Sequence, residues 1–190
     1  MEETSIQSQA MQADRDKLPA PKGIGMAVAF DWGLTVELLL IPILSIFLGS
    51  SLFPKQVNLD PKLSIAVSFL FLWPIAVLFA IFGESIRRGV RWTRPVQIVG
   101  NTLGFLGGFG VLVQLWNGIK AGNFWPVVPA VILLIFSPLI AWRLSRPETA
   151  RWFAGVTGAE ARKRHGGIWI WEIAAWAIVG GFLVAWGIFH

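Results

Sequence analysis

The stretch from Ile24 to Ser50 constrains the fold of this chain most, because it is a predominantly apolar run long enough to cross a bilayer. A hydrocarbon core about 30 Å thick requires about 20 helical residues. Two registers fit: residues 25–44 with Asp31 and Glu37 both inside, or residues 31–50 with Asp31 at the interface. Glu37 lies in the hydrocarbon in both registers. An ionisable side chain at that depth costs roughly 2.5–3.5 kcal/mol on insertion scales, so it usually has a function.

The composition extends this conclusion to the whole chain. Hydrophobic residues make up 55% of the sequence and charged residues 14%, and the mean hydropathy is +0.63. These values predict an all-α integral membrane bundle, with little chain left for a separate soluble domain. We expect a polar tail, residues 1–22, before a single transmembrane domain, residues 23–190. The predicted spans cover about residues 25–50, 63–82, 96–116, 124–142 and 168–189.

The distribution of basic residues predicts the orientation. The tail and the connections at residues 83–95 and 143–167 carry thirteen Lys and Arg, against three in the remaining connections. The positive-inside rule then places the N-terminus and both basic loops in the cytoplasm, and the C-terminus outside. The tail lacks a basic n-region, so the first span is expected to remain as a signal anchor. We expect a multi-pass protein of the bacterial cytoplasmic membrane. Topology accounts for the basic residues, so no nucleic-acid partner is expected.

The two basic loops are expected to contact membrane lipids, including anionic headgroups. In the segment 143–167, Pro147 suits a helix start, and Thr157 with Glu160 fits a capping box. Trp152 and Phe153 among arginines favour a helix on the membrane surface, although a solvated connecting loop fits equally well. The residues expected to contact headgroups are Arg87, Arg88, Arg91, Arg94, Arg162, Lys163 and Arg164.

Small residues recur every four positions on three of the predicted spans. This spacing places them on one helix face, where another backbone can approach closely. Such stripes suit a tight bundle or a lateral contact with another membrane subunit or a second copy. The residues expected to pack helices in this way are Gly25, Ala29 and Gly33; Gly100, Gly104 and Gly108 (the glycine stripe); and Ala177, Gly181 and Ala185.

A polar cluster is predicted in the cytoplasmic half of the bundle. Glu37, Asn101 and Glu172 lie at similar depth, and Thr102 is next to Asn101. Asp31 is about 120° around the helix from Glu37, so it is expected to meet Lys22 or an arginine of residues 83–95. No Lys or Arg lies inside a predicted span. Glu37 is therefore expected to be protonated, to bind a cation, or to pair with another chain.

The sequence contains no recognisable catalytic constellation. It has no cysteine, and its two histidines fall in a basic loop and at the last position, so no metal site is predicted and the protein is not expected to be an enzyme. No cofactor is predicted either. The chain is rich in tryptophan, however, and Trp73 and Trp176 lie inside spans, where they could contact a bound lipid, quinone or pigment.

Two stretches resemble parts of small RDD-type membrane proteins. They are Lys22 followed by the step from Ala29 to Asp31, and the sequence FGESIRRGVR at residues 82–91. The second stretch is shorter than the usual Gly-Lys run of that family, and the paired first-span aspartates are absent. The resemblance covers only part of the chain and implies no particular activity for it.

Two functions remain in view. Size, packing stripes and the lack of a catalytic pattern favour an accessory, structural or assembly subunit of a larger membrane complex. The alternative is a small proton- or cation-coupled carrier centred on Glu37, which would need a conducting site inside the bundle.

Overall fold

A computed structural model describes residue 21 and residues 23–48 and 60–189 of the chain. Within these ranges the chain forms helices and no strand, and five helical segments are long and apolar enough to span a membrane, which confirms the predicted fold class. These segments are α2 (Ile24–Leu48), α3 (Pro61–Arg87), α4 (Thr93–Lys120), the continuous α5 (Val127–Val131), η1 (Ile132–Phe136) and α6 (Ser137–Ser145), and α9 (Ile168–Gly187). Lys22, His190, most of the tail and most of the first connecting loop lie outside the described residues.

The ends of the helices extend beyond the apolar runs. α3 begins with Pro61 after Asp60, whose side chain accepts a hydrogen bond from the backbone N–H of Lys62 at 2.8 Å. It continues to Arg87, because Ile86 is buried and Glu84 forms ion pairs with Arg87 and Arg88 along the helix. The expected loop at residues 83–95 is therefore mostly helical, and only a short turn separates α3 from α4.

The segment between α6 and α9 folds into two short helices, α7 (Pro147–Gly155) and α8 (Gly158–Arg164). The expected starts are confirmed: Pro147 opens α7, and the Thr157 hydroxyl accepts a hydrogen bond from the backbone N–H of Glu160 at 3.3 Å. Trp152 and Phe153, however, fit neither expectation for this segment, a helix on the membrane surface or a solvated loop. Both side chains are 2% exposed. They pack into the protein core instead of facing lipid or water, because α7 folds back onto the start of α2 and the end of α3.

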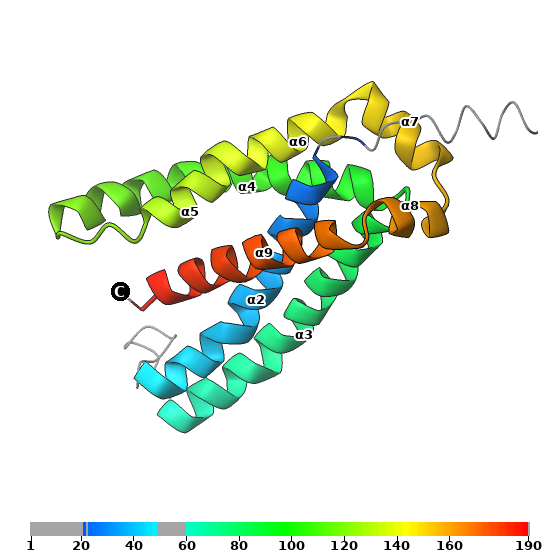
Figure 1. Ribbon diagram of the computed structural model, residues 1–190. Coiled ribbons are helices and arrows are strands. Elements are labelled where there is room, and N and C mark those ends of the chain that lie inside the picture. The colour runs from blue at the N-terminus through cyan, green and yellow to red at the C-terminus, as the bar shows by residue number, and fades with distance from the viewer. Residues whose placement is uncertain (1–20, 22, 49–59, 190) are drawn as a thin grey trace, which may run out of the picture.

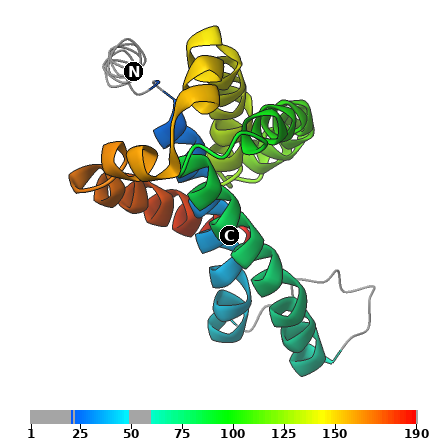
Figure 2. The same cartoon turned by 90° about the vertical axis from the view of Figure 1, so that its right-hand side faces the viewer.

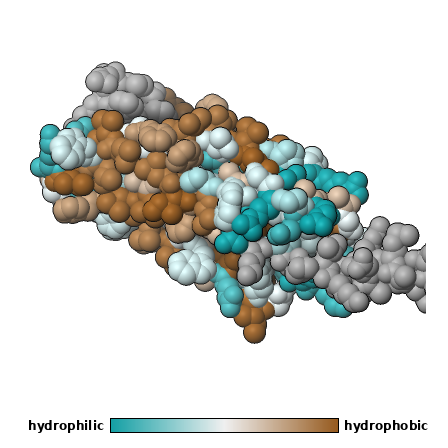
Figure 3. Space-filling model, turned by 90° about the horizontal axis from the view of Figure 1, so that it is seen from above, coloured by the Kyte–Doolittle hydropathy of each residue, from teal (hydrophilic) through white to brown (hydrophobic). Residues whose placement is uncertain are grey.

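The helices form three arms that meet at one end of the molecule (Figures 1 and 2). α2 packs along both α3 and α9, whereas α4 packs mainly against η1 and α6 to form a separate hairpin. The convergent end contains the turn between α3 and α4 together with α7 and α8, and is called the arginine-rich end below. Away from it, α3 and α4 diverge (Figure 2). Hydrophilic residues gather at the arginine-rich end, and the rest of the visible surface is mainly apolar (Figure 3).

Small residues bring the arms into contact. α2 and α9 cross where Gly33 faces Ala177 and Gly181; a Cβ on Gly181 would lie 2.7 Å from the Cβ of Val36. Nearer the arginine-rich end, Gly25 lies against Trp169 and Ile173 of α9. These contacts allow α2 and α9 to run in the same direction with their backbones close together.

The α4 hairpin uses part of the glycine stripe in the same way. Gly104 and Gly108 face Leu133 of η1, and a Cβ on Gly108 would lie 2.8 Å from the Cδ2 of Leu134. Gly100 is different, because no atom of the described residues lies within 4 Å of the position of its missing Cβ. The π-helical turn η1 ends next to Ser137, whose hydroxyl donates a 3.3 Å hydrogen bond to the carbonyl of Ile132. Pro138 follows and has no N–H to donate, which favours this local irregularity.

Candidate functional site

The most unusual polar contact in the described residues joins α2 to α4. Asp31 is 1% exposed, and its Oδ1 accepts a hydrogen bond from the Nε2 of Gln97 at 3.1 Å. Gly83 of α3 leaves room for this side chain, since a Cβ on Gly83 would lie 3.1 Å from the Cβ of Asp31. Three helices therefore enclose a single carboxyl group near the arginine-rich end of the membrane-spanning region.

Asn101 lies one turn beyond Gln97 on α4 and is also 1% exposed. Its Nδ2 donates a 2.9 Å hydrogen bond to the backbone carbonyl of Gln97. Two buried acceptors remain without a hydrogen-bond donor among the described residues, the Oδ2 of Asp31 and the Oδ1 of Asn101. An unsatisfied buried polar atom costs about 1–3 kcal/mol. The site formed by Asp31, Gln97 and Asn101, called the buried amide–carboxyl site below, therefore lacks a donor, which a proton on Asp31, a water or a cation would supply.

The residues of the predicted polar cluster have different surroundings in the structure. Glu37 is partly buried beside the crossing of α2 and α9, and no described residue forms a hydrogen bond with it. Thr102 is exposed and donates a 2.8 Å hydrogen bond to the carbonyl of Ile98, and Glu172 is exposed at the start of α9. Asn101 and Thr102 are neighbours on one helix, about 100° apart, so only one of them can face the α2 side.

The partner of Asp31 also differs from the expectation. An arginine of residues 83–95 was the expected partner within the described part of the chain, and Gln97 occupies that place. Sequence reasoning missed Gln97. A signal was present, because Gln97 and Asn101 are four residues apart in an apolar span and therefore lie on the same helix face.

The arginines of the turn between α3 and α4 bind the carbonyl ends of other helices. Arg87 donates to the carbonyl of His165 at 3.0 Å, Arg91 to that of Ala154 at 2.6 Å, and Arg94 to that of Leu144 at 2.8 Å. These carbonyls lie at the ends of α8, α7 and α6. The last carbonyls of a helix lack intrahelical donors, and a cation there also interacts favourably with the helix dipole. The three side chains therefore fix three helix ends; their expected contact with headgroups stays a prediction.

His165 is buried at the same end, and its ring lies between two indoles that are tilted relative to it. Its ring lies 5.3 Å from that of Trp152 and 4.6 Å from that of Trp169, centroid to centroid, and its Nδ1 lies 3.3 Å from the carbonyl oxygen of Arg87. Burial lowers the pKa of His165 below its ordinary value of 6.5, and the charges of Arg87 and Arg164 act in the same direction, while the hydrogen bond to the Arg87 carbonyl opposes them. His165 is therefore held neutral as a packing residue.

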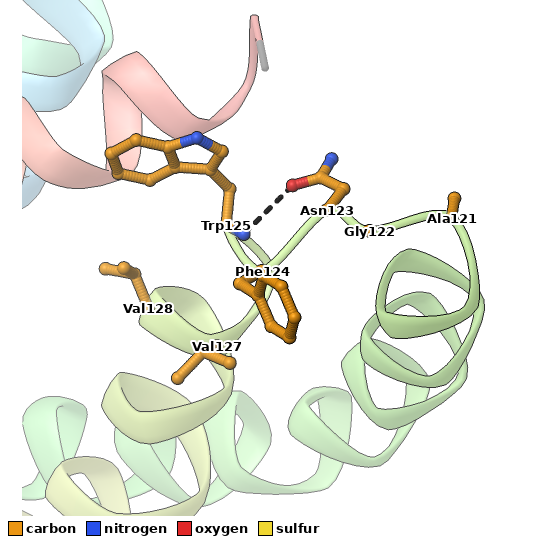
Figure 4. A pocket seen from close by; sticks show the side chains of 7 residues that line it. All are labelled: Ala121, Gly122, Asn123, Phe124, Trp125, Val127 and Val128. Carbon is orange, nitrogen blue, oxygen red and sulfur yellow. Dashed lines mark hydrogen bonds between the residues drawn. The ribbon is translucent and has the colours of Figure 1, made fainter.

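An open pocket of about 640 Å³ lies at the opposite end of the α4 hairpin (Figure 4). The backbone N–H of Trp125 donates a 3.0 Å hydrogen bond to the Oδ1 of Asn123, and the indole of Trp125 packs against Gly187 of α9. No titratable side chain lines the pocket, so its lining offers no acid, base or metal ligand. The lining residues are Ala121, Gly122, Asn123, Phe124, Trp125, Val127 and Val128.

The two tryptophans expected to contact a bound lipid, quinone or pigment lie at the surface of the described part of the chain. Trp73 and Trp176 are exposed on the outer faces of α3 and α9. The described residues contain no group of three or more His, Asp or Glu side chains that could hold a metal ion.

The chain shows no similarity that would identify it: no protein-family model matches it, and neither a curated protein sequence nor a solved structure shows significant similarity to it. The likeness to RDD-type membrane proteins therefore remains a local resemblance.

Proposed function

We propose that the protein is a non-catalytic subunit that assembles with other proteins of the membrane. The observation that carries the proposal is the divergence of α3 and α4, which leaves an apolar face on each of them without contact from the other described residues (Figure 2). On α3 the exposed side chains include Leu70, Phe71 and Leu78, and on α4 they include Leu103 and Leu106. We refer to these two surfaces as the open faces.

Lipid can cover any apolar helix, so a second observation on α4 supports a protein partner. At Gly100, Gly107 and Gly110, no described residue lies within 4 Å of the position of a Cβ. A glycine inside a helix costs about 1 kcal/mol relative to alanine, and membrane helices use such residues where another backbone approaches closely. Gly104 and Gly108 make such contacts within the chain. We propose that Gly100 and Gly107 make them with a helix of another subunit.

Site-specific photocross-linking in the native membrane tests this proposal. A photoreactive amino acid at Leu103, between Gly100 and Gly107, should yield a discrete adduct with another protein. The matched control places it at Ile140 on α6, which is 1% exposed and should react only within the chain. Adducts with lipid alone from Leu103 would contradict the proposal.

A second candidate function is supported by the buried amide–carboxyl site. A proton- or cation-coupled carrier needs ionisable groups inside the membrane with room for the transported species. Asp31 has an unsatisfied oxygen, and Glu37 lies about 1.7 turns further along α2. On this proposal the carrier is centred on both acids and not on Glu37 alone.

Flux measurements in liposomes separate the two functions. If the protein is a carrier, Asp31→Asn or Glu37→Gln should abolish proton or cation flux while the protein still assembles. If it is a subunit, both variants should assemble with little change in the activity of the complex. Flux that survives both substitutions would remove the carrier from consideration.

A further inference from the structure

Trp142 and two arginines form a separate cluster at the end of α6. Trp142 is 51% exposed. The guanidinium of Arg146 lies 4.2 Å from the centroid of its indole, and that of Arg143 lies 5.3 Å from the same centroid. Both distances are typical of cation–π contacts. Two positive charges are therefore held at one half-exposed aromatic ring.

These two arginines differ from five others at the arginine-rich end, which have partners within the chain. Arg151 and Arg162 also have no carboxylate or carbonyl partner among the described residues, but neither of them lies over an indole there. Arg87 and Arg88 both pair with the carboxylate of Glu84, Arg164 pairs with Glu160, and helix carbonyls bind Arg91 and Arg94. Arg143 and Arg146 have no carboxylate partner among the described residues, and the Nε of Arg143 is a buried donor without an acceptor. Two guanidiniums without an anion at one place form a receptor for an oxyanion, which can accept several N–H donors at once.

The position of the cluster indicates the source of the anion. Trp142 lies in the last turn of the membrane-spanning segment Val127–Ser145, and Arg146 follows directly in an extended conformation. Tryptophan prefers the interface of a membrane, where the phosphates of phospholipids lie. The exposed indole offers an acyl chain an apolar surface beside the two cations. A free phosphate ion would use the cations and leave the exposed part of the indole uncovered.

We propose that Trp142, Arg143 and Arg146 bind one anionic phospholipid, with the phosphate between the two guanidiniums and an acyl chain against the indole. The site goes beyond the proposed assembly function, because it needs no partner protein. It also differs from the residues that the sequence pattern assigned to headgroups, several of which have carboxylates or helix carbonyls as partners.

Native mass spectrometry of the detergent-solubilised full chain tests the site. Short-chain phosphatidylglycerol is the probe, phosphatidylcholine is the uncharged comparison, and inorganic phosphate distinguishes a free anion from a lipid. The wild-type chain should retain phosphatidylglycerol, and Arg143→Gln with Arg146→Gln should weaken this binding by about tenfold or more, because each basic residue near a membrane surface contributes about 1 kcal/mol.

Two controls keep this test decisive. Lys62→Gln with Arg151→Gln removes the same charge from exposed positions and should leave phosphatidylglycerol binding within about twofold of wild type. The stem of Arg143 packs against Gly23, so the exposed Arg146→Gln alone serves if the double variant fails to fold. Trp142→Ala should also weaken lipid binding. Equal loss in both double variants, equal retention of phosphatidylcholine, or displacement of the lipid by inorganic phosphate would overturn the proposal.

Discussion

At the scale of single residues, the buried amide–carboxyl site predicts a specific cost for losing Gln97. Gln97→Leu removes the hydrogen bond to the Oδ1 of Asp31 and leaves both carboxyl oxygens unsatisfied. We expect the free energy of unfolding to fall by about 1–3 kcal/mol, measured by denaturant titration in detergent. Gln114→Leu, at an exposed position of the same helix, is the matched control and should be neutral or slightly stabilising.

A second substitution checks that Asp31 causes the loss of stability in Gln97→Leu. In the Gln97→Leu background, Asp31→Asn should restore part of the lost stability, because a neutral amide costs less to bury than an unpaired carboxylate. The account of this site fails if Gln97→Leu and Gln114→Leu are equally stable, or if Asp31→Asn lowers stability further.

His165 predicts a pH dependence of stability. Burial lowers the pKa of His165 in the folded chain, so the unfolded chain takes up the proton first as the pH falls. The contribution of this residue is therefore complete above its ordinary pKa of 6.5 and decreases as the pH falls from there toward the lower folded-state pKa. Melting temperatures between pH 8 and pH 5.5 should fall in the wild type. His165→Gln, which stays neutral, should reduce that slope; an unchanged slope would show that another group causes it.

Part of the buried amide–carboxyl site could be predicted from the sequence. The cost of placing Asp31 and Glu37 in an apolar span marked them as exceptional residues. It could not show that Gln97 would be the partner of Asp31. That pairing joins residues 66 positions apart and depends on how α2 and α4 are rotated about their axes, which no local pattern determines.

At the scale of elements, the crossing of α2 and α9 predicts a large difference between two adjacent glycines. A Cβ on Gly181 would clash with the carbonyl oxygen of Gly33 and lie 2.7 Å from the Cβ of Val36. A Cβ on Gly180 would meet no atom of the described part of the chain within 4 Å. Gly181→Ala should lower the unfolding free energy by about 1–3 kcal/mol, because the helices must separate. Gly180→Ala should be neutral or stabilising, since alanine favours helix. Equal melting temperatures for the two variants would contradict this crossing.

The existence of the elements was easier to predict than their ends and contacts. Hydrophobic runs of sufficient length predicted all five spans. They could not predict that α3 would continue to Arg87, because Glu84 and the two arginines that pair with it are polar. They also misplaced Trp152: an aromatic residue among arginines suits a membrane surface, and only the folding of α7 over α2 and α3 buries it.

At the scale of the whole molecule, the count of basic residues predicts that the arginine-rich end is cytoplasmic. The chain has no cysteine, so single cysteines report their own position without background. A cysteine in place of Arg162, exposed in α8, should react with a membrane-impermeant maleimide only after the membrane is opened. A cysteine in place of Ala121, exposed at the end of α4, should react in intact cells. The reverse labelling pattern would show that the topology is the opposite of the predicted one.

The open faces of α3 and α4 make assembly the central claim about the whole molecule, and the native mass after extraction in mild detergent tests it most directly. We expect the 21.0 kDa chain to migrate in a complex several times its own mass with a fixed set of other membrane proteins. Identification of those chains would then define the process that the protein serves. A lone monomer, or a small oligomer containing only this chain, would contradict the account.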